Sequence, residues 1–210
     1  MRAAIGLADA DGLAAVSLRK VGAALDAGPM RLYGYLSTKE ELLDLMVDQV
    51  YGEIPLPGPD AGGWRAVLAD LAVRTRRAAR QHEWFIELLG GRPQLGPNAL
   101  AHLEAWLAAF EDVPGFADID RALQAVGTVR GFLIGALSAE LAERRVERGT
   151  GLDERQWQAQ TGPYVQRMLE TGRYPNLRRV VVEAEHPDSS VGFLVGLNFV
   201  LDGIAAGIKD

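Results

Sequence analysis

Hydrophobic residues recur at intervals of three and four along most of the chain. This spacing places them on one face of an α-helix, whereas a half-buried strand would alternate strictly. In Trp64–Gln81, for example, Val67, Leu68 and Leu71 share one side. The pattern predicts an all-α fold with helices at Arg2–Asp11, Ser17–Leu25, Pro29–Leu36, Glu40–Gly52, Trp64–Gln81, Glu83–Leu89, Asn98–Glu111, Asp118–Arg148, Glu154–Thr171, Asn176–Glu185 and Ser190–Lys209.

The segment Ile54–Gly63 is the clearest break in this pattern. It holds three prolines and three glycines in ten residues and cannot continue a helix. We therefore place a domain boundary there. The predicted organisation is an N-terminal domain at residues 1–53, a linker at 54–63 and a larger helical domain at 64–210.

Two short helices in the N-terminal domain, Ser17–Leu25 and Pro29–Leu36, flank a tight turn. Ser17 can cap the first, and the second is too short to be stable without its neighbours. This is the layout of a helix-turn-helix, whose second helix enters the major groove of DNA. Residues 12–39 carry four Lys or Arg and one Asp, which suits that role. An ordinary helical hairpin with solvated charges remains the alternative.

Apolar, basic and turn residues keep a defined spacing through the first fifty residues. They are Ile5, Ala8, Gly12, Leu13, Leu18, Arg19, Val21, Leu32, Tyr33, Tyr35 and the run Thr38–Asp44. This pattern resembles the N-terminal domain of the TetR family of bacterial repressors. A looser similarity to its tetracycline-repressor branch covers Thr171–Leu177 and the run near Gly196. The resemblance implies a three-helix DNA-binding domain followed by a helical bundle that binds a ligand and dimerises.

The resemblance also implies which side chains contact DNA. The second short helix would be the recognition helix, and its Arg31 could bond a guanine edge in bidentate fashion. Lys39 would meet a phosphate at the start of the next helix. The predicted DNA-binding residues are Ser17, Arg19, Pro29, Met30, Arg31, Tyr33, Tyr35, Thr38 and Lys39.

Three residues depart from the family pattern. The family usually has glycine at the position of Asp26 and a small polar cap at that of Gly28. Gly34 lies inside the second short helix, where glycine costs about 1 kcal/mol relative to alanine. A degenerate DNA-binding domain is therefore an alternative.

Polar residues outside the apolar stripes are expected to face water or to cap helices. Asp44 and Asp48 fall on the polar side of Glu40–Gly52, and Asn98 would cap the helix that follows it. Four arginines near the end of Trp64–Gln81 form a basic cluster. We expect a solvated helix terminus favoured by the helix dipole, with a second DNA contact as the alternative. They are Arg74, Arg76, Arg77 and Arg80.

The composition narrows the class of protein. The chain of 210 residues carries a net charge of −6 and has no cysteine, which excludes disulfides and thiolate metal sites. No signal peptide, glycine-rich phosphate loop or paired histidine–carboxylate metal motif is visible. We expect a cytoplasmic protein that is not an enzyme and has no cofactor. Its basic residues near the short helices would create a local positive field, although the net charge of the whole chain is negative.

The segment Val191–Ile208 is 18 residues long with Asn198 and Asp202 as its polar residues. Its length permits a short membrane span, but a central aspartate costs about 3 kcal/mol on insertion scales. We interpret it as a helix buried almost all round, with glycines on a face where another helix comes close. By the resemblance, this helix at 190–209 and the long helix near 125–145 form a homodimer, which matches a palindromic DNA operator.

The resemblance implies a small-molecule site in the C-terminal bundle. The histidines that hold metal-chelated drug in tetracycline-binding relatives are replaced by Leu88 and Gly131, which argues against tetracycline–magnesium recognition. His82, His102 and His186 lie at no ligand spacing, and we expect surface or structural roles for them. Aromatic and apolar residues, which are more often core, favour a hydrophobic inducer. The candidate ligand-binding residues are Trp84, Leu88, Trp106, Phe110, Arg130, Ile134, Trp157 and Tyr164.

Arg130 lies mid-helix among apolar residues and needs a partner if it is buried. We expect a salt bridge, with Asp202 as one candidate, ahead of an anionic ligand. The sequence as a whole predicts a DNA-binding transcriptional regulator, a repressor that a hydrophobic inducer releases from a palindromic operator. The alternatives are an enzyme, for which no motif is present, and a dimeric helical ligand-binding protein with a degenerate DNA-binding domain.

Overall fold

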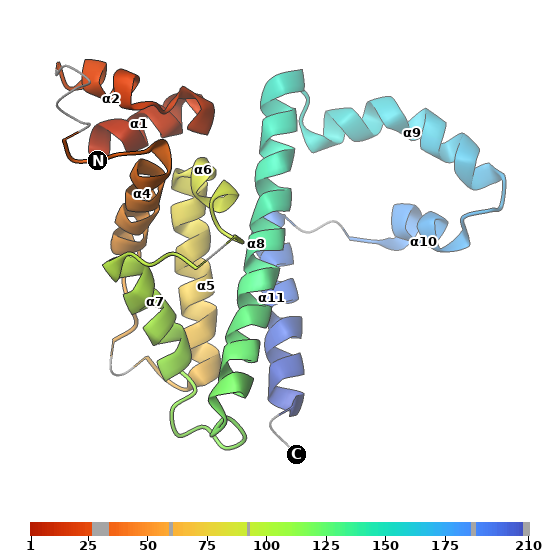
Figure 1. Ribbon diagram of the computed structural model, residues 1–210. Helices are drawn as coiled ribbons and strands as arrows, with labels where there is room; N and C mark the ends of the chain where they lie inside the picture. Colours follow the sequence, from red (N-terminus) through yellow and green to blue (C-terminus); the bar gives the residue numbers. More distant parts are fainter. Residues whose placement is uncertain (27–33, 59–60, 92, 186–187, 208–210) are drawn as a thin grey trace. The chain divides into compact units, whose positions relative to one another are not determined.

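The computed structural model describes residues 1–26, 34–58, 61–91, 93–185 and 188–207. These residues form α-helices and one 3₁₀ helix, with no strand among them, so the all-α prediction is confirmed. The elements (Figure 1) are α1 (Arg2–Asp11), η1 (Leu13–Ala15), α2 (Leu18–Ala24), α4 (Lys39–Glu53), α5 (Trp64–Gln81), α6 (Glu83–Glu87), α7 (Pro97–Ala108), α8 (Ile119–Thr150), α9 (Glu154–Glu170), α10 (Pro175–Glu183) and α11 (Ser189–Ala206).

The predicted helices agree closely with the observed ones. Within the described residues their ends differ by three residues or fewer. The predicted recognition helix Pro29–Leu36 falls mostly on residues 27–33, which lie outside the described part of the chain. The predicted cap at Ser17 lies within the described residues and can be compared directly.

Side chains cap the helices of the N-terminal region. The Ser17 hydroxyl accepts a hydrogen bond of 3.2 Å from the Lys20 amide at the start of α2. The Thr38 hydroxyl accepts one of 3.1 Å from the Glu41 amide, and Glu41 Oε2 accepts one of 2.6 Å from the Ser37 amide. Since the first amides of a helix have no partner within it, these bonds set where α2 and α4 begin.

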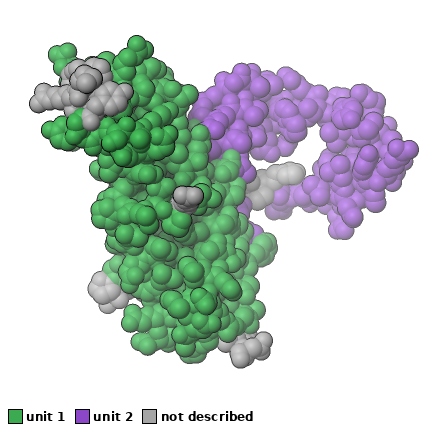
Figure 2. Space-filling view, in the orientation of Figure 1, with its two compact units in different colours: residues 1–138, 196–210 green, residues 139–195 purple. Residues whose placement is uncertain are grey.

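Two compact units make up the chain (Figure 2). One comprises residues 1–138 and 196–210, and the other residues 139–195. The helices α8 and α11 each contribute residues to both units. The predicted boundary at 54–63 lies inside the first unit, and the division into two functional domains stays a prediction.

Asp48 does not face water as expected. It is buried on α4, where its Oδ1 accepts a hydrogen bond of 2.9 Å from the Ala99 amide in the first turn of α7. The Asn98 side-chain amide donates to Asp48 Oδ2 at 3.0 Å. Asn98 is therefore not the cap of α7, which begins after Gly96. An acidic side chain from another helix caps α7 instead and fixes α4 to it.

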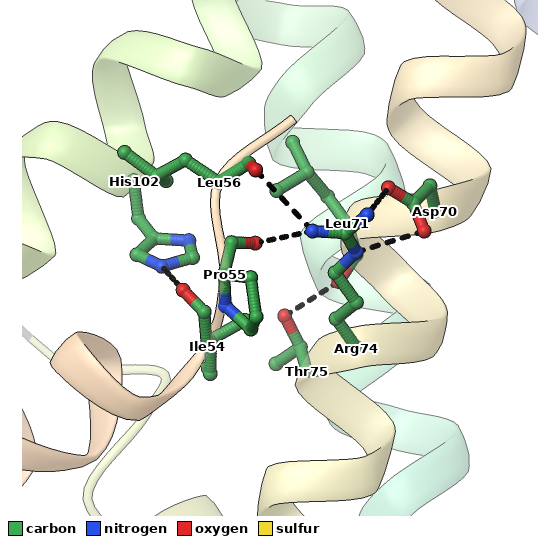
Figure 3. Close-up of polar contacts among 8 residues, drawn as sticks. All are labelled: Ile54, Pro55, Leu56, Asp70, Leu71, Arg74, Thr75 and His102. Carbon is green, nitrogen blue, oxygen red and sulfur yellow. Dashed lines mark hydrogen bonds and ion pairs between the residues drawn. The ribbon is translucent and has the colours of Figure 1, made fainter. Parts of the chain in front are cut away.

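The basic end of α5 is also less solvated than expected. Arg74 pairs with Asp70 one turn earlier, with 2.7 Å between Nη2 and Oδ2. It also donates to the carbonyl oxygens of Pro55 and Leu56 at 2.9 and 3.3 Å (Figure 3). Arg76 is buried. The expectation of a solvated cluster is therefore wrong for Arg74, which the segment after α4 contacts, and for Arg76, which is buried.

Within the first unit, α11 packs against α8. A Cβ on Gly196 would lie 2.8 Å from the Phe132 ring, so this glycine allows the close approach that the sequence predicted. Leu197 and Leu201 are buried, but Phe199 is 72% exposed. One chain therefore covers α11 only in part, and burial all round would need a second chain.

Both α8 and α11 are long and apolar enough to cross a membrane by length and composition. Core helices of soluble proteins pass the same test, so this property is weak evidence for a span. Asp202 of α11 pairs with Arg65 of α5, with 2.7 Å between Oδ1 and Nη2. This polar contact to another helix of the same unit favours the interpretation as a packed protein helix.

Candidate functional site

The predicted DNA-binding residues divide into those that the structure describes and those that it does not. Pro29, Met30, Arg31 and Tyr33 lie outside the described residues. Ser17 and Thr38 act as helix caps, whereas Arg19 is exposed and Tyr35 is 82% exposed. Lys39 Nζ donates to the Leu13 carbonyl at 3.2 Å and so ties α4 to η1. Arg19 and Tyr35 are thus available to an external partner.

His82 joins the N-terminal helices to α5 and α6. Its Nδ1 lies 2.9 Å from Asp9 Oδ1 on α1, and its Nε2 lies 3.0 Å from Glu53 Oε2 at the end of α4. Trp84 Nε1 donates to the same Asp9 oxygen at 2.7 Å. The ring of His82 is buried, so this cluster has the structural role expected of it and holds α1 and α4 against the helical body.

A small cavity of about 30 Å³ lies in the helical body. Two of the predicted ligand residues, Trp106 of α7 and Arg130 of α8, line it. The sequence analysis missed the others, although His102 lies four residues before Trp106 and so shares its buried helix face, which is a detectable signal. The lining residues are Tyr51, Pro93, Gln94, Ala99, His102, Leu103, Trp106 and Arg130.

The remaining predicted ligand residues lie elsewhere. Trp84 is buried beside His82 and Phe85, and Phe110 stacks on Phe116 with ring centroids 4.3 Å apart. These two side chains are core, the alternative that the sequence left open. Leu88 lines a neighbouring groove, Ile134 packs near Gly90, and Trp157 and Tyr164 are exposed residues of α9 in the second unit.

Arg130 interacts with Tyr51 of α4, and Asp202, one of the candidate partners named from the sequence, is not its partner. Asp202 is taken by Arg65 instead, since α11 presents it to the first turn of α5. Burial raises the pKa of the Tyr51 phenol, and the Arg130 charge and hydrogen bond oppose this in part. The phenol is therefore neutral at physiological pH. Arginine has no acceptor, so the phenol oxygen accepts from it and keeps its own O–H to donate.

His102 supplies an acceptor to the same cavity. The residue is 3% exposed, and its Nε2 lies 3.0 Å from the Ile54 carbonyl oxygen (Figure 3). Because a carbonyl only accepts, Nε2 carries the proton and the neutral ring has its lone pair on Nδ1. That nitrogen is buried without a hydrogen-bond partner among the described residues. Burial lowers the pKa of His102, against the effect of hydrogen bonds to the Ile54 and Tyr51 backbone, which favours this neutral form.

A larger open groove of about 1170 Å³ adjoins this region. Pro93 and Gln94 line both the groove and the small cavity, so they form a shared wall. Gln94 Nε2 is held by a long hydrogen bond of 3.5 Å to the Leu88 carbonyl. Leucines and carboxylates both line the groove, and its leucines are Leu36, Leu45, Leu88 and Leu95.

Together these features define a class of protein in which one helix, α4, connects a capped N-terminal helix region to a body with an internal cavity. This is the arrangement of a ligand-responsive regulator. Comparison with known proteins gives the family. The model of the tetracyclin repressor-like C-terminal domain matches residues 56–208.

Relatives and solved structures agree with this match. The HTH-type transcriptional repressor DrrR1 of Streptomyces coeruleorubidus is 38% identical over 208 residues, which is 97% of this chain and 75% of that protein. An HTH-type transcriptional regulator of Saccharopolyspora erythraea is 39% identical over 138 residues, 66% of this chain and 58% of that protein. The structure of ActR from Streptomyces coelicolor in complex with actinorhodin has a TM-score of 0.81 at 26% identity and covers 99% of this chain and 95% of its own.

The chain belongs to the TetR family and is a DNA-binding transcriptional regulator. The predicted family, fold class and function class are thereby confirmed. Regulators of this family bind DNA operators and small molecules and act as dimers. They are typically not enzymes.

Proposed function

We propose that this regulator is a cytoplasmic homodimeric repressor that binds a palindromic operator and is released by a hydrophobic small molecule. One observation carries the proposal: α4 reaches both regions involved. Its first turn is tied to the helix-turn-helix region through Lys39 and Leu13. Its last turns place Asp48 on α7, Tyr51 on the cavity and Glu53 on His82.

A ligand in the body would act through α4. The cavity is too small for an inducer as it stands, so binding would displace residues such as Tyr51 on its wall. Displacement of Tyr51 moves the helix that carries it, and with it the DNA-binding region. The ligand then needs only a modest preference for the displaced state to shift the equilibrium. Equal separation of the two DNA-binding regions with and without inducer, measured by spin-label distances, would contradict this mechanism.

The proposed dimer interface is formed by α8 near residues 125–145 and by α11. Exposed apolar side chains of α11, among them Leu194, Val195 and Phe199, support it, and on α8 the exposed Leu123 and Val146 flank the stretch 125–145. Two-fold symmetry would set two recognition helices about one DNA turn apart. The proposed DNA contacts are the nine residues predicted from the sequence, within a domain at 1–53.

The proposed inducer is hydrophobic and aromatic. The cavity walls Tyr51, Leu103 and Trp106 support this, as does the solved complex of the relative ActR with actinorhodin. Ile134, Trp157 and Tyr164, which line neither the cavity nor the groove and are not core, remain proposals for a ligand-bound state.

The test is an anisotropy titration against DNA from upstream of the gene, at two salt concentrations. Tight binding that falls steeply with salt and is lost in Arg31→Ala supports the proposal. Arg155→Ala, an equal change at an exposed arginine of α9, should bind as the wild type does. Binding no tighter than to random DNA would favour the alternative, a ligand-binding protein with a degenerate DNA-binding domain. An assay for turnover of each compound that releases the protein would separate a regulator from an enzyme.

A further inference from the structure

The small cavity holds an acceptor without a donor. His102 Nδ1 is buried, and no hydrogen-bond partner for it occurs among the described residues. The ring cannot turn to satisfy this nitrogen, because its Nε2 is already held by the Ile54 carbonyl at 3.0 Å. A buried acceptor left unpaired costs free energy. A group that donates a hydrogen bond would therefore be favoured at this position.

Donors face the same space from two other helices. Arg130 of α8 and Tyr51 of α4 both line the cavity, and the Tyr51 O–H is not used in its contact with Arg130. A hydroxyl group can pair with the acceptor and with a donor at the same time. Its hydrogen can be donated to His102 Nδ1, and its oxygen can accept a hydrogen bond from Arg130 or Tyr51. A carbonyl, an ether or an ammonium group satisfies only one of them.

The size of the cavity agrees with a single hydroxyl. Its volume of about 30 Å³ exceeds the roughly 10–15 Å³ that a cavity needs to hold one water molecule, so a hydroxyl group fits. The rings of Tyr51 and His102, with centroids 5.3 Å apart and planes tilted by 43°, both lie at this cavity. The remainder of a ligand would extend past Pro93 and Gln94, which also line the large groove.

We propose that the His102 cavity is a specificity site for an aromatic hydroxyl, which donates to His102 Nδ1 and accepts from Arg130. This inference rests on the proposed function, since it names the chemical class of the inducer. It also assigns His102 a role in ligand selection, in addition to its structural contact with Ile54.

The test compares two probes that differ in one hydrogen-bond donor, 2-naphthol and 2-methoxynaphthalene. Their binding to the full chain is measured by calorimetry. The wild type should bind 2-naphthol about tenfold more tightly, the usual effect of one buried hydrogen bond. His102→Phe should remove this preference. Glu104→Gln, at an exposed position on the same helix, should keep it.

A second variant keeps the test valid if His102→Phe does not fold. Arg130→Met removes a donor that both probes can use through their oxygen, so it should weaken both and leave the preference intact. Equal affinity of the two probes for the wild type, or no binding of 2-naphthol, would overturn the inference. So would a preference that His102→Phe leaves unchanged, which is the result expected if the cavity holds only a structural water.

Release from upstream DNA separates this inference from the proposed function. If a compound without a hydroxyl releases wild type and His102→Phe equally, the repressor proposal stands and the hydroxyl site is wrong. If the wild type prefers 2-naphthol but does not bind the upstream DNA, the site stands and the repressor proposal fails.

Discussion

Asp26 adopts a left-handed backbone conformation, with φ at 51°. This is the position at which the family usually has glycine, which has no Cβ to oppose such a φ. Asp26→Gly should therefore raise the free energy of unfolding by up to about 1 kcal/mol, measured by urea denaturation. The same change at Asp44, an exposed residue inside α4, should lower it by about 1 kcal/mol. A loss of stability in Asp26→Gly would show that the aspartate side chain contributes more than the strain costs.

His102 should make stability depend on pH. Burial lowers its pKa in the folded chain, so below about pH 6.5 the unfolded chain takes up a proton first. Its contribution is complete above that pH and is lost as the pH falls towards the folded pKa. Between pH 7.5 and 5.5 the wild type should lose more stability than His102→Gln, by at most about 1.4 kcal/mol per pH unit. Equal losses in urea titrations would contradict this assignment. The neighbouring Tyr51 stays neutral throughout, since its pKa is raised.

The contact between α4 and α7 depends on a matched pair, Asp48 and Gly96. A Cβ on Gly96 would lie 2.2 Å from Asp48 Oδ1, so Gly96→Ala should cost about 1–3 kcal/mol. Asp48→Ala leaves the Ala99 amide without its acceptor and should cost about 2–3 kcal/mol. In the double variant the carboxylate is gone, but the Cβ of residue 48 would still lie 2.6 Å from the new Cβ. The clash is relieved only in part, so the combined loss should be smaller than the sum of the two single losses. Additive losses of unfolding free energy would mean that Gly96 is needed for another reason.

The helices could be predicted from the sequence because their signals are local. Apolar spacing, the caps at Ser17 and Thr38, and the stop at Gly12, where φ is 76°, lie within one or two turns of the ends that they determine. The polar partners between helices could not be predicted in the same way. Asp48 falls on the polar face of its own helix, which predicts a surface residue. Only the fold brings the start of α7, fifty residues later, into contact with it.

The candidate cavity shows the same limit. Trp106 and Arg130 stood out by residue type and line it, but Trp84 and Phe110 stood out equally and are core. A large aromatic residue shows the same sequence spacing whether it lines a cavity or packs in the core. From the sequence, His102 is expected to be structural, because no second histidine lies at ligand spacing. Its unpaired nitrogen exists only once Ile54, from the segment after α4, has taken the other one.

The helices α8 and α11 have exposed apolar side chains in a single chain. In the proposed dimer that binds DNA, a second chain would cover them. DNA binding by a pair of helix-turn-helix regions gains affinity because binding of the first places the second beside its half-site. The N-terminal region cannot supply this link alone. The helix α11, with Phe199 at 72% exposure, packs through Gly196 on Phe132 of α8, and α8 also supplies Arg130 to the cavity wall. In the proposed dimer, dimerisation and ligand response would therefore share α8.

Phe199→Glu tests this arrangement. A charge at this exposed site should leave the helical fold intact but oppose its burial between two chains. Sedimentation velocity should show a shift from dimer to monomer, and the affinity for upstream DNA should fall by about 100-fold or more. Val182→Glu is the matched control, since Val182 of α10 is also 72% exposed. It should remain dimeric and bind DNA as the wild type does. A dimeric Phe199→Glu with unchanged DNA affinity would place the interface elsewhere, and loss of the dimer in Val182→Glu would extend it to the second unit.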